Sequence, residues 1–261
     1  MAQEHNKKGN GGGRREVIIL AGGKGTRMKT EFPKVLTEVA GRPLITHVVE
    51  QVNKLGLESE PIIVVGYKGD QVKDRLSNHS RFSHQLEQKG TGHAVMSARR
   101  EALREKGSIL ILYGDQPLVK TDTLQKIFEA HENHDSPITI ATTIVDAYDG
   151  WQKPFYDFGR IVRNEKGNVV GIIEKKDATD DQREGIREVN VAYYCVDADW
   201  LWNSLDKVTT NNVQGEYYLT DIVGIAFEEG HPIVAVDIPP KEALGVNSPE
   251  QLIVVENMFV R

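Results

Sequence analysis

A glycine-rich turn with nearby cations is the strongest chemical signal in the sequence. Gly22, Gly23 and Gly25 directly follow an apolar run, and the cations Arg27 and Lys34 come next. Glycines let the backbone approach a ligand closely, so that N–H groups can point at phosphate oxygens. Arginine offers a planar fork for a phosphate, whereas lysine offers a compact point charge. The pattern predicts a phosphate-binding loop, and its alternative is a tight turn with solvated cations.

The loop does not fit two common phosphate-binding motifs. In a Walker A motif the last glycine is followed by lysine and then serine or threonine, but position 27 is Arg27. The dinucleotide fingerprint would need its third glycine where Met28 stands. What remains is a strand, a glycine-rich turn and a set of cations, which by themselves name no ligand class.

Apolar runs that alternate with helical patterns place this loop at the end of a strand. The first half of the chain predicts strands at residues 17–21, 62–65, 82–87, 108–113 and 138–145, and helices at 44–55, 70–77, 91–106 and 121–132. This alternation predicts an α/β fold: a Rossmann-like open, mostly parallel mixed sheet with helices on both faces. Ligands on such sheets bind beyond the carboxyl ends of the strands, which selects the loops 22–33, 87–92 and 114–117.

The second half of the chain has longer strand patterns separated by polar turns. Strands are predicted at 159–162, 169–174, 187–196 and 232–237, and helices at 214–229 and 249–259. Tyr218 is expected on the core side of the helix 214–229, and residues 177–185 are expected to form a charged loop. With neither an internal repeat nor a linker, we expect one folded domain.

Composition and charge exclude several classes of protein. The net charge of −6 argues against a broad nucleic-acid footprint, and no run approaches the ~20 apolar residues of a membrane span. The polar, glycine-rich residues 1–15 have no apolar signal region, so we expect a disordered tail and a cytoplasmic protein. Cys195 is the only cysteine, which excludes an internal disulfide, and its apolar neighbours predict a buried, inert thiol.

One further group of side chains could suggest a metal site. His131, Glu132, His134 and Asp135 lie within five positions of each other. They end a predicted surface helix, where histidines also suit the helix dipole. We therefore expect no metal there.

The glycine loop and seven further motifs resemble the sugar nucleotidyltransferases, and among them the bacterial N-acetylglucosamine-1-phosphate uridylyltransferases. The loop is similar to the signature Leu-x-x-Gly-x-Gly-Thr-Arg-Met, which is followed shortly by Pro-Lys. The other matching segments are 85–94, 112–118, 159–163, 173–179, 188–190, 212–221 and 245–247. Because all of them occur in the family's order over residues 17–259, the joint match is far more specific than any single motif.

The resemblance implies a role for each matching residue. Arg27 and Lys34 would be the catalytic cations, and Lys34 would stabilise the transition state. The implied nucleotide-binding residues are Leu20, Ala21, Gly22, Gly23, Gly25, Gln85, Gly90 and Thr91. The implied sugar-binding residues are Tyr113, Gly114, Gly159, Glu174 and Asn190. Asp115 and Asn247 would hold Mg²⁺.

The reaction implied by the resemblance joins UTP to N-acetylglucosamine 1-phosphate, and gives UDP-N-acetylglucosamine and pyrophosphate for cell-envelope (peptidoglycan) precursor synthesis. A sugar phosphate oxygen would attack the α-phosphorus in line, so positioning and charge neutralisation would dominate catalysis. Residues 16–145 would form a nucleotide-binding half and residues 146–261 a sugar-binding half. The printed chain contains no hexapeptide repeats of the family's trimerising acetyltransferase domain. We therefore expect uridylyl transfer alone and leave the oligomeric state open.

Departures from the family pattern keep alternatives open. Gly22 stands where alanine is usual and related thymidylyltransferases carry a double glycine, so dTTP is the alternative nucleotide. Val191 and Ala192 stand where Thr-Gly is usual, so another hexose 1-phosphate is the alternative sugar. The segment 146–158 is also longer and more aromatic than usual. A non-catalytic nucleotide-sugar sensor is a third alternative, against which the intact cations and Asp115 argue.

Overall fold

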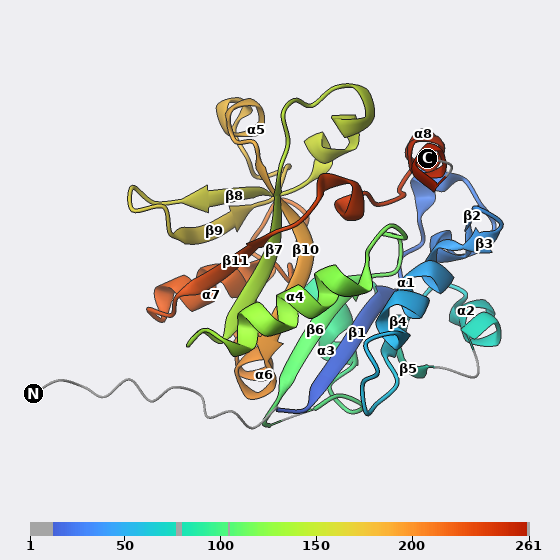
Figure 1. Cartoon of the computed structure of the whole chain (residues 1–261), viewed down its shortest axis with the longest axis horizontal. Helices are drawn as coiled ribbons and strands as arrows, with labels where there is room; N and C mark the ends of the chain where they lie inside the picture. The colour runs from blue at the N-terminus through green and yellow to red at the C-terminus, as the bar shows by residue number, and fades with distance from the viewer. Residues whose placement is uncertain (1–12, 77–79, 104, 260–261) are drawn as a thin grey trace, which may run out of the picture.

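The computed structural model describes residues 13–76, 80–103 and 105–259, and its centre is a mixed nine-stranded sheet (Figure 1). The main path through the sheet is β11 (Ile233–Asp237), β7 (Ile138–Ile144), β10 (Glu188–Asp197), β6 (Ser108–Tyr113), β1 (Arg15–Ala21), β4 (Ile62–Val65) and β5 (Arg81–His84). Off this path, β8 (Arg160–Arg163) pairs with β10 and with β9 (Val169–Ile173). β1 is parallel to β4 and β6, whereas β10 is antiparallel to β6 and β7. The predicted mostly parallel mixed sheet is confirmed.

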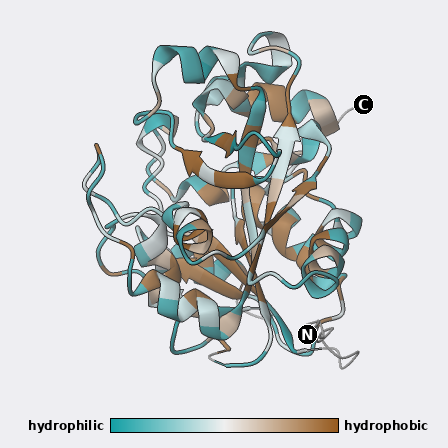
Figure 2. Cartoon of the chain, turned by 90° about the vertical axis from the view of Figure 1, so that its left-hand side faces the viewer, coloured by the Kyte–Doolittle hydropathy of each residue, from teal (hydrophilic) through white to brown (hydrophobic). Residues whose placement is uncertain are grey.

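Helices cover both faces of this sheet, as the sequence predicts (Figure 1). One face packs against α1 (Leu44–Asn53), α2 (Gly69–Leu76), α4 (Thr121–Glu132) and α8 (Pro249–Phe259). The other face packs against α3 (Thr91–Ser97), α6 (Ala198–Leu205) and α7 (Asp221–Glu228). Figure 2 shows the resulting hydrophobic centre, with apolar strands between amphipathic helices. Alternate residues of β1 therefore face opposite layers, which explains its uninterrupted apolar sequence.

Both halves of the chain contribute to this single sheet. β10 comes from the second half and lies between β6 and β7 of the first half. At its end the chain returns to the first half, where α8 packs near the small hairpin β2 (Glu38–Val39) and β3 (Arg42–Pro43). There the ring of Phe259 lies 4.8 Å from that of His47.

Two predicted helices are longer in the sequence interpretation than in the structure. The helix predicted over 91–106 ends at Ser97, because side chains from the sheet hold the backbone that follows. Arg81 donates to the carbonyl of Glu101 at 2.6 Å, and Glu16 accepts from the amide of Leu103 at 2.6 Å. These bonds replace the helical ones.

The helix predicted over 214–229 begins only at Asp221. Gly215 has a φ of +65°, and Tyr217 pairs with the loop before α3 instead of with its own neighbours. Its amide donates to Lys89 at 2.8 Å, and its carbonyl accepts from Gly92 at 2.8 Å.

Smaller corrections concern the charged loop, the tail and β5. Within 177–185 the structure has a helix, α5 (Asp180–Gly185), which is started by a reciprocal capping box between Thr179 and Gln182. The predicted tail 1–15 falls mostly outside the described residues, but Arg15 begins β1. β5 ends at His84 rather than at residue 87, and α6 was not predicted.

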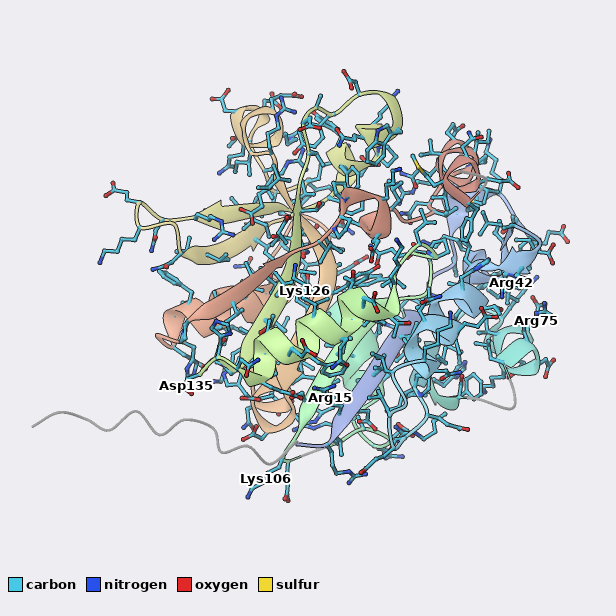
Figure 3. All side chains as sticks on the ribbon, in the orientation of Figure 1. Arg15, Arg42, Arg75, Lys106, Lys126 and Asp135 are labelled. Atoms are coloured by element: carbon cyan, nitrogen blue, oxygen red, sulfur yellow. The ribbon has the colours of Figure 1, made fainter. Side chains whose placement is uncertain are left out.

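Charged side chains lie mainly on the outside. Figure 3 shows Arg42, Arg75, Lys106 and Asp135 at the periphery, and each of them is exposed. Arg160 is fully buried, and it anchors a segment beside the candidate site. Among the residues that the structure describes, every helix is too short or too polar to cross a bilayer.

Candidate active site

The largest concentration of predicted site residues lines one open cleft at the carboxyl ends of β1 and β6. This cleft has a volume of about 470 Å³. Its predicted lining residues are Leu20, Ala21, Gly22, Gly23, Lys34, Gln85, Gly90, Thr91, Tyr113, Asp115, Gly159, Glu174, Asn190 and Asn247. The cleft thus lies at the edge of the sheet where ligands of parallel sheets are expected to bind.

Three predicted residues lie behind the lining or at its edge. A Cβ built on Gly25 would lie 2.5 Å from the Cβ of Lys34, so this glycine leaves room for the lysine. A Cβ on Gly114 would lie 3.3 Å from both Ile45 and Val35, which is a close packing contact. Arg27 belongs to a short 3-10 helix, η1 (Thr26–Met28), and its side chain is 61% exposed. Gly25 and Gly114 therefore allow neighbouring side chains to pack closely against the backbone.

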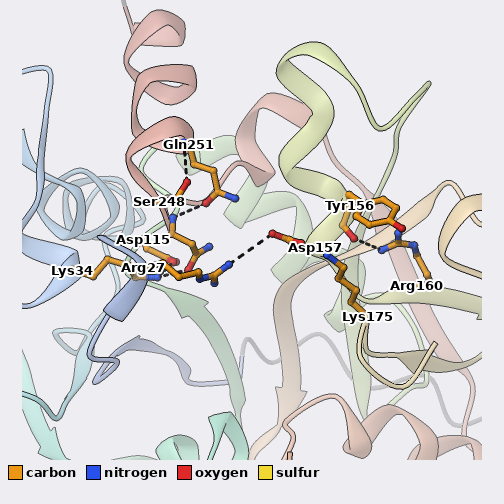
Figure 4. A network of polar contacts seen from close by, with 10 residues as sticks. Arg27, Lys34, Asp115, Tyr156, Asp157, Arg160, Lys175, Ser248 and Gln251 are labelled. Carbon is orange, nitrogen blue, oxygen red and sulfur yellow. Dashed lines mark hydrogen bonds and ion pairs between the residues drawn. The ribbon is translucent and has the colours of Figure 1, made fainter. Parts of the chain in front are cut away.

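One cation and two oxygen-bearing side chains meet in the cleft, and Figure 4 shows two of them, Lys34 and Asp115. The ammonium of Lys34 forms an ion pair with the carboxylate of Asp115 and donates to Oδ1 of Asn247 at 2.7 Å. The carboxylate and the amide oxygen therefore converge on one cationic position. Carboxylate and amide oxygens are also the protein ligands that suit Mg²⁺.

Local structure explains this convergence. Lys34 starts the 3-10 helix η2 (Lys34–Leu36), and Asp115 follows β6 by two residues. The amide of Val246 donates to the carbonyl of Asp115 at 2.9 Å, which ties the two oxygen-bearing loops together. The amide of Asn247 in turn donates to Oε1 of Gln251 at 2.6 Å. Gln251 is buried, so it holds Asn247 from the first turn of α8.

The cleft contains the residues predicted to bind the nucleobase. Nε2 of Gln85 donates to the carbonyl of Gly90 at 3.0 Å and faces Nδ1 of His93 at 3.2 Å. Gly90 has a φ of +111°, and a Cβ there would lie 2.6 Å from the carbonyl oxygen of Tyr217. Glycine is therefore required at this position. Thr91 accepts from the amide of Leu219 at 3.0 Å, which fixes its hydroxyl.

The cleft also contains the residues predicted to bind the sugar. The amide of Asn190 donates to the carbonyl of Gly159 at 2.9 Å, and its side chain donates to the hydroxyl of Tyr194 at 2.7 Å. The hydroxyl of Thr220 donates to the carboxylate of Glu174 at 3.1 Å. Burial in the cleft wall raises the pKa of Glu174, since desolvation disfavours its charged form.

Several lining residues were missed by the sequence interpretation. Gln116 donates to the carbonyls of Val191 at 3.0 Å and Ala243 at 3.1 Å. Within the described part of the chain, its Oε1 and the Tyr218 hydroxyl are buried without a hydrogen-bond partner. Both residues line the cleft, so the expectation that Tyr218 packs on the core side of a helix was wrong. Buried oxygens without a partner are candidate contacts for a ligand.

The backbone at Ala192 is also unusual. Its φ is +69°, within a register shift of β10 between Asn190 and Tyr194. The amide of Ala192 donates to Oδ1 of Asn190 at 3.0 Å. The departure from Thr-Gly that the sequence showed therefore places an alanine in a left-handed conformation beside the cleft.

The histidine and cysteine to which the sequence analysis gave no role in the site lie outside the cleft. His131 is fully buried, with its ring 3.1 Å from the Thr139 hydroxyl and 3.1 Å from a carboxylate oxygen of Asp197, so its expected surface position was wrong. Across the described ranges, no three of the His, Cys, Asp and Glu side chains form a group that could hold a metal ion. Cys195 is fully buried in the core, as predicted.

Comparisons with known proteins agree with this architecture. Residues 17–175 match the family model described as the MobA-like NTP transferase domain. The chain is 42% identical over 240 residues to the bifunctional protein GlmU of Heliobacterium modesticaldum, which covers 92% of this chain and 50% of that protein. It is also 42% identical over 235 residues to the bifunctional protein GlmU of Geobacillus thermodenitrificans, which covers 90% of this chain and 49% of that protein. The chain thus spans about half the length of these relatives.

A solved structure supports the fold alone. A UDP-glucose pyrophosphorylase complexed with UDP-glucose superimposes with a TM-score of 0.70 over 95% of this chain and 98% of that chain. The sequence identity in this comparison is 19%. It therefore carries the arrangement of the elements and not the roles of individual residues.

Proposed function

The chain belongs to the MobA-like NTP transferase domain family, and we propose that it transfers uridylyl from UTP to N-acetylglucosamine 1-phosphate, with release of pyrophosphate. This proposal is carried by the gathering in one cleft of the residues assigned to the base, the phosphates and the sugar. They are Gln85 and Thr91, the glycine loop and Lys34, and Glu174 and Asn190. A nucleoside triphosphate with its base at Gln85 would bring its phosphates into the same cleft as the sugar phosphate.

Lys34 supports this assignment because its ammonium lines the cleft beside Asp115 and Asn247. The two substrates are both anions, and their repulsion opposes the in-line attack of the sugar phosphate oxygen on the α-phosphorus. A lysine ammonium held there can stabilise the charge that develops in the transition state. The glycines of the preceding loop allow the phosphates to approach the backbone closely.

Asp115 and Asn247 fit a role in holding Mg²⁺. Their two oxygens already contact the ammonium of Lys34, so the position between them suits a cation. Two protein oxygens suit Mg²⁺, because this ion usually keeps waters and phosphate oxygens as its other ligands. When bound, the metal would neutralise phosphate charge. Lys34 would then exchange its two internal partners for the substrate phosphates.

The experiment is a measurement of pyrophosphate release from the purified chain with UTP, N-acetylglucosamine 1-phosphate and Mg²⁺. We expect release only when both substrates are present, and its loss on addition of a chelator. The variant Lys34→Ala serves as the inactive control for the same preparation. Release that is no faster than with Lys34→Ala would remove the proposed activity and favour a non-catalytic nucleotide-sugar sensor.

The second candidate function is a transfer from dTTP, and the space beside Gly22 in the glycine loop supports it. A Cβ on Gly22 would lie 3.0 Å from Oε1 of Gln85, the side chain assigned to the nucleobase. The glycine leaves extra room there, which could suit a base that carries an additional methyl group. Parallel arms with dTTP and with glucose 1-phosphate in the same assay separate these alternatives by their relative kcat/KM values. We also propose a cytoplasmic location for the protein.

A further inference from the structure

We propose that Asp157 is a positioning residue that holds Arg27 in the substrate-free cleft and thereby sets the affinity for the triphosphate. This inference rests on the proposed function of the cleft. Nη1 of Arg27 lies 3.7 Å from Oδ2 of Asp157 (Figure 4). The arginine follows the glycine loop of the first half, whereas the aspartate ends the 3-10 helix η3 (Gly150–Asp157) of the second half. The ion pair therefore connects the two halves at the edge of the cleft.

The aspartate stands on a firmly held segment. Phe155 of η3 is fully buried, and its ring lies 5.0 Å from that of Phe158. The buried guanidinium of Arg160 donates to the carbonyl of Tyr156 at 3.2 Å, to that of Phe158, and to that of Arg183 at 2.8 Å. These contacts fix the aromatic segment 155–158 to the core, so the backbone that carries Asp157 is held in place.

The arginine, in contrast, is the partner that can move. Its side chain is 61% exposed, and its ion-pair partner among the described residues, Asp157, lies at the long distance of 3.7 Å. Glycines precede it, and Gly25 has a φ of +60°. An exposed ion pair of this kind contributes little net energy, so a polyanion nearby can compete for the guanidinium.

Lys175 keeps the charge of Asp157 neutralised after such an exchange. Its ammonium forms a second ion pair with Asp157 and lies 4.6 Å from the centre of the Tyr156 ring. Asp157 therefore has a cation in both states, whereas Arg27 exchanges a carboxylate for phosphate oxygens. Because Asp157 and the phosphates compete for one guanidinium, the carboxylate should weaken triphosphate binding in proportion to the strength of its ion pair.

The test is a thermodynamic cycle on the complete chain. The variants are Asp157→Asn, Arg27→Ala and their combination, and the reading is the dissociation constant of UTP with Mg²⁺ by titration calorimetry, without sugar phosphate. Asp157→Ser is a second variant of the aspartate, and thermal unfolding verifies that each variant is folded. The same cycle with inorganic tripolyphosphate reports on Arg27 independently of the base. Steady-state rates give kcat and the KM of UTP for each variant.

We expect Asp157→Asn to tighten UTP binding and lower its KM about 1.5- to fivefold, the range that an exposed ion pair spans. Its kcat should change less than twofold, since the ion pair is already broken in the substrate complex. In the Arg27→Ala background the same change should have no effect. Lys175→Met should weaken binding only while Asp157 is present, because the aspartate then depends on Arg27 alone.

Other outcomes would overturn the inference. Weaker binding of UTP by Asp157→Asn would mean that the carboxylate orients Arg27 productively. An equal effect in the Arg27→Ala background would mean that the charge of Asp157 acts on the phosphates directly and not through Arg27. No change in either ligand's dissociation constant would also reject it. Should UTP fail to bind while the tripolyphosphate cycle shows the expected coupling, the nucleotide assignment would fall and the Arg27–Asp157 competition would stand.

Discussion

Lys34 and Asn247 are separated by 213 positions in the chain, yet Nζ of the lysine donates to Oδ1 of the asparagine at 2.7 Å. The contact joins the loop after β1 to the loop before α8, and so it links the beginning and the end of the folded chain. Asp115 completes the group from the end of β6. The cation and the oxygens proposed for catalysis therefore form one unit before any substrate binds.

The first prediction concerns the cation of this unit. Lys34→Ala should lower kcat about 100- to 1000-fold, because removal of one preorganised donor typically costs about 2.7–4 kcal/mol of barrier. The fold should persist, since the side chain is confined to the cleft. Initial rates of pyrophosphate release measure the effect, and Lys54→Ala, at an exposed position beyond α1, is the matched loss of a lysine. A rate for Lys34→Ala within threefold of the unchanged protein would remove the proposed role.

The second prediction concerns the support of Asn247. Gln251→Leu removes the acceptor for the Asn247 amide, so the asparagine loses its fixed orientation. Residues that orient metal ligands typically contribute 10- to 100-fold to metal affinity. We expect the Mg²⁺ concentration for half-maximal rate to rise about tenfold.

Gln251→Glu is the conservative control, because a carboxylate keeps the acceptor oxygen for the same amide. Its Mg²⁺ requirement should stay close to that of the unchanged protein. If Leu and Glu at position 251 behaved alike in the Mg²⁺ titration, the orienting role of this side chain would be refuted.

Much of the fold could be predicted because its signals are local. The continuous apolar run of β1 faces packed layers on both sides, and the glycines after it mark the strand end. The helices α1, α4 and α8 begin or end close to the predicted positions. The helix predicted through residue 106 failed because Arg81 and Glu16, distant in sequence, capture the backbone after Ser97. The hydrophobic periodicity of a segment does not reveal such tertiary hydrogen bonds.

In the candidate site, too, some features could be predicted from the sequence and others could not. The residues alone indicated a phosphate loop, but the pairing of Asp115 with Asn247 came from the resemblance to a family, since their separation leaves no local signal. Gln116 and Tyr218 were missed because a buried oxygen without a partner is a property of the packed cleft. The Arg27–Asp157 ion pair was missed because it needs the position of η3, which buried Phe155 and Arg160 determine.

The third prediction concerns Glu174, which is proposed to bind the sugar. Glu174→Ala should raise the KM of the sugar phosphate about 10- to 100-fold, because hydrogen bonds to charged groups contribute about 1.5–3 kcal/mol. The KM of UTP should change much less, since Glu174 is assigned to the sugar and Gln85 to the base. Steady-state kinetics with each substrate varied in turn measures both constants. Equal changes in the two KM values would contradict the assignment of Glu174 to the sugar.

The fourth prediction concerns pH and Asp221, the first residue of α7. Burial and the nearby charge of Asp177 raise the pKa of Asp221 to about 6 in the folded chain, whereas an unfolded aspartate titrates near 3.9. Between these values the folded state binds the proton more tightly, so this group's contribution to the free energy of unfolding falls as pH rises from about 4 to about 6. Above pH 6 the folded chain carries the full penalty of a partly buried charge.

Asp221→Asn removes this penalty, so the variant should be more stable than the unchanged chain at pH 7. We expect a difference of about 1 kcal/mol, because the carboxyl is only half buried and solvent screens part of the effect. The difference should shrink toward zero near pH 4, where the aspartate is largely protonated when folded. Urea unfolding of both proteins at pH 4, 5, 6 and 7 measures this trend. The exposed change Asp135→Asn is the control, and it should give a difference that does not follow the same pH course; an identical course for both variants would rule out the buried carboxyl as its source.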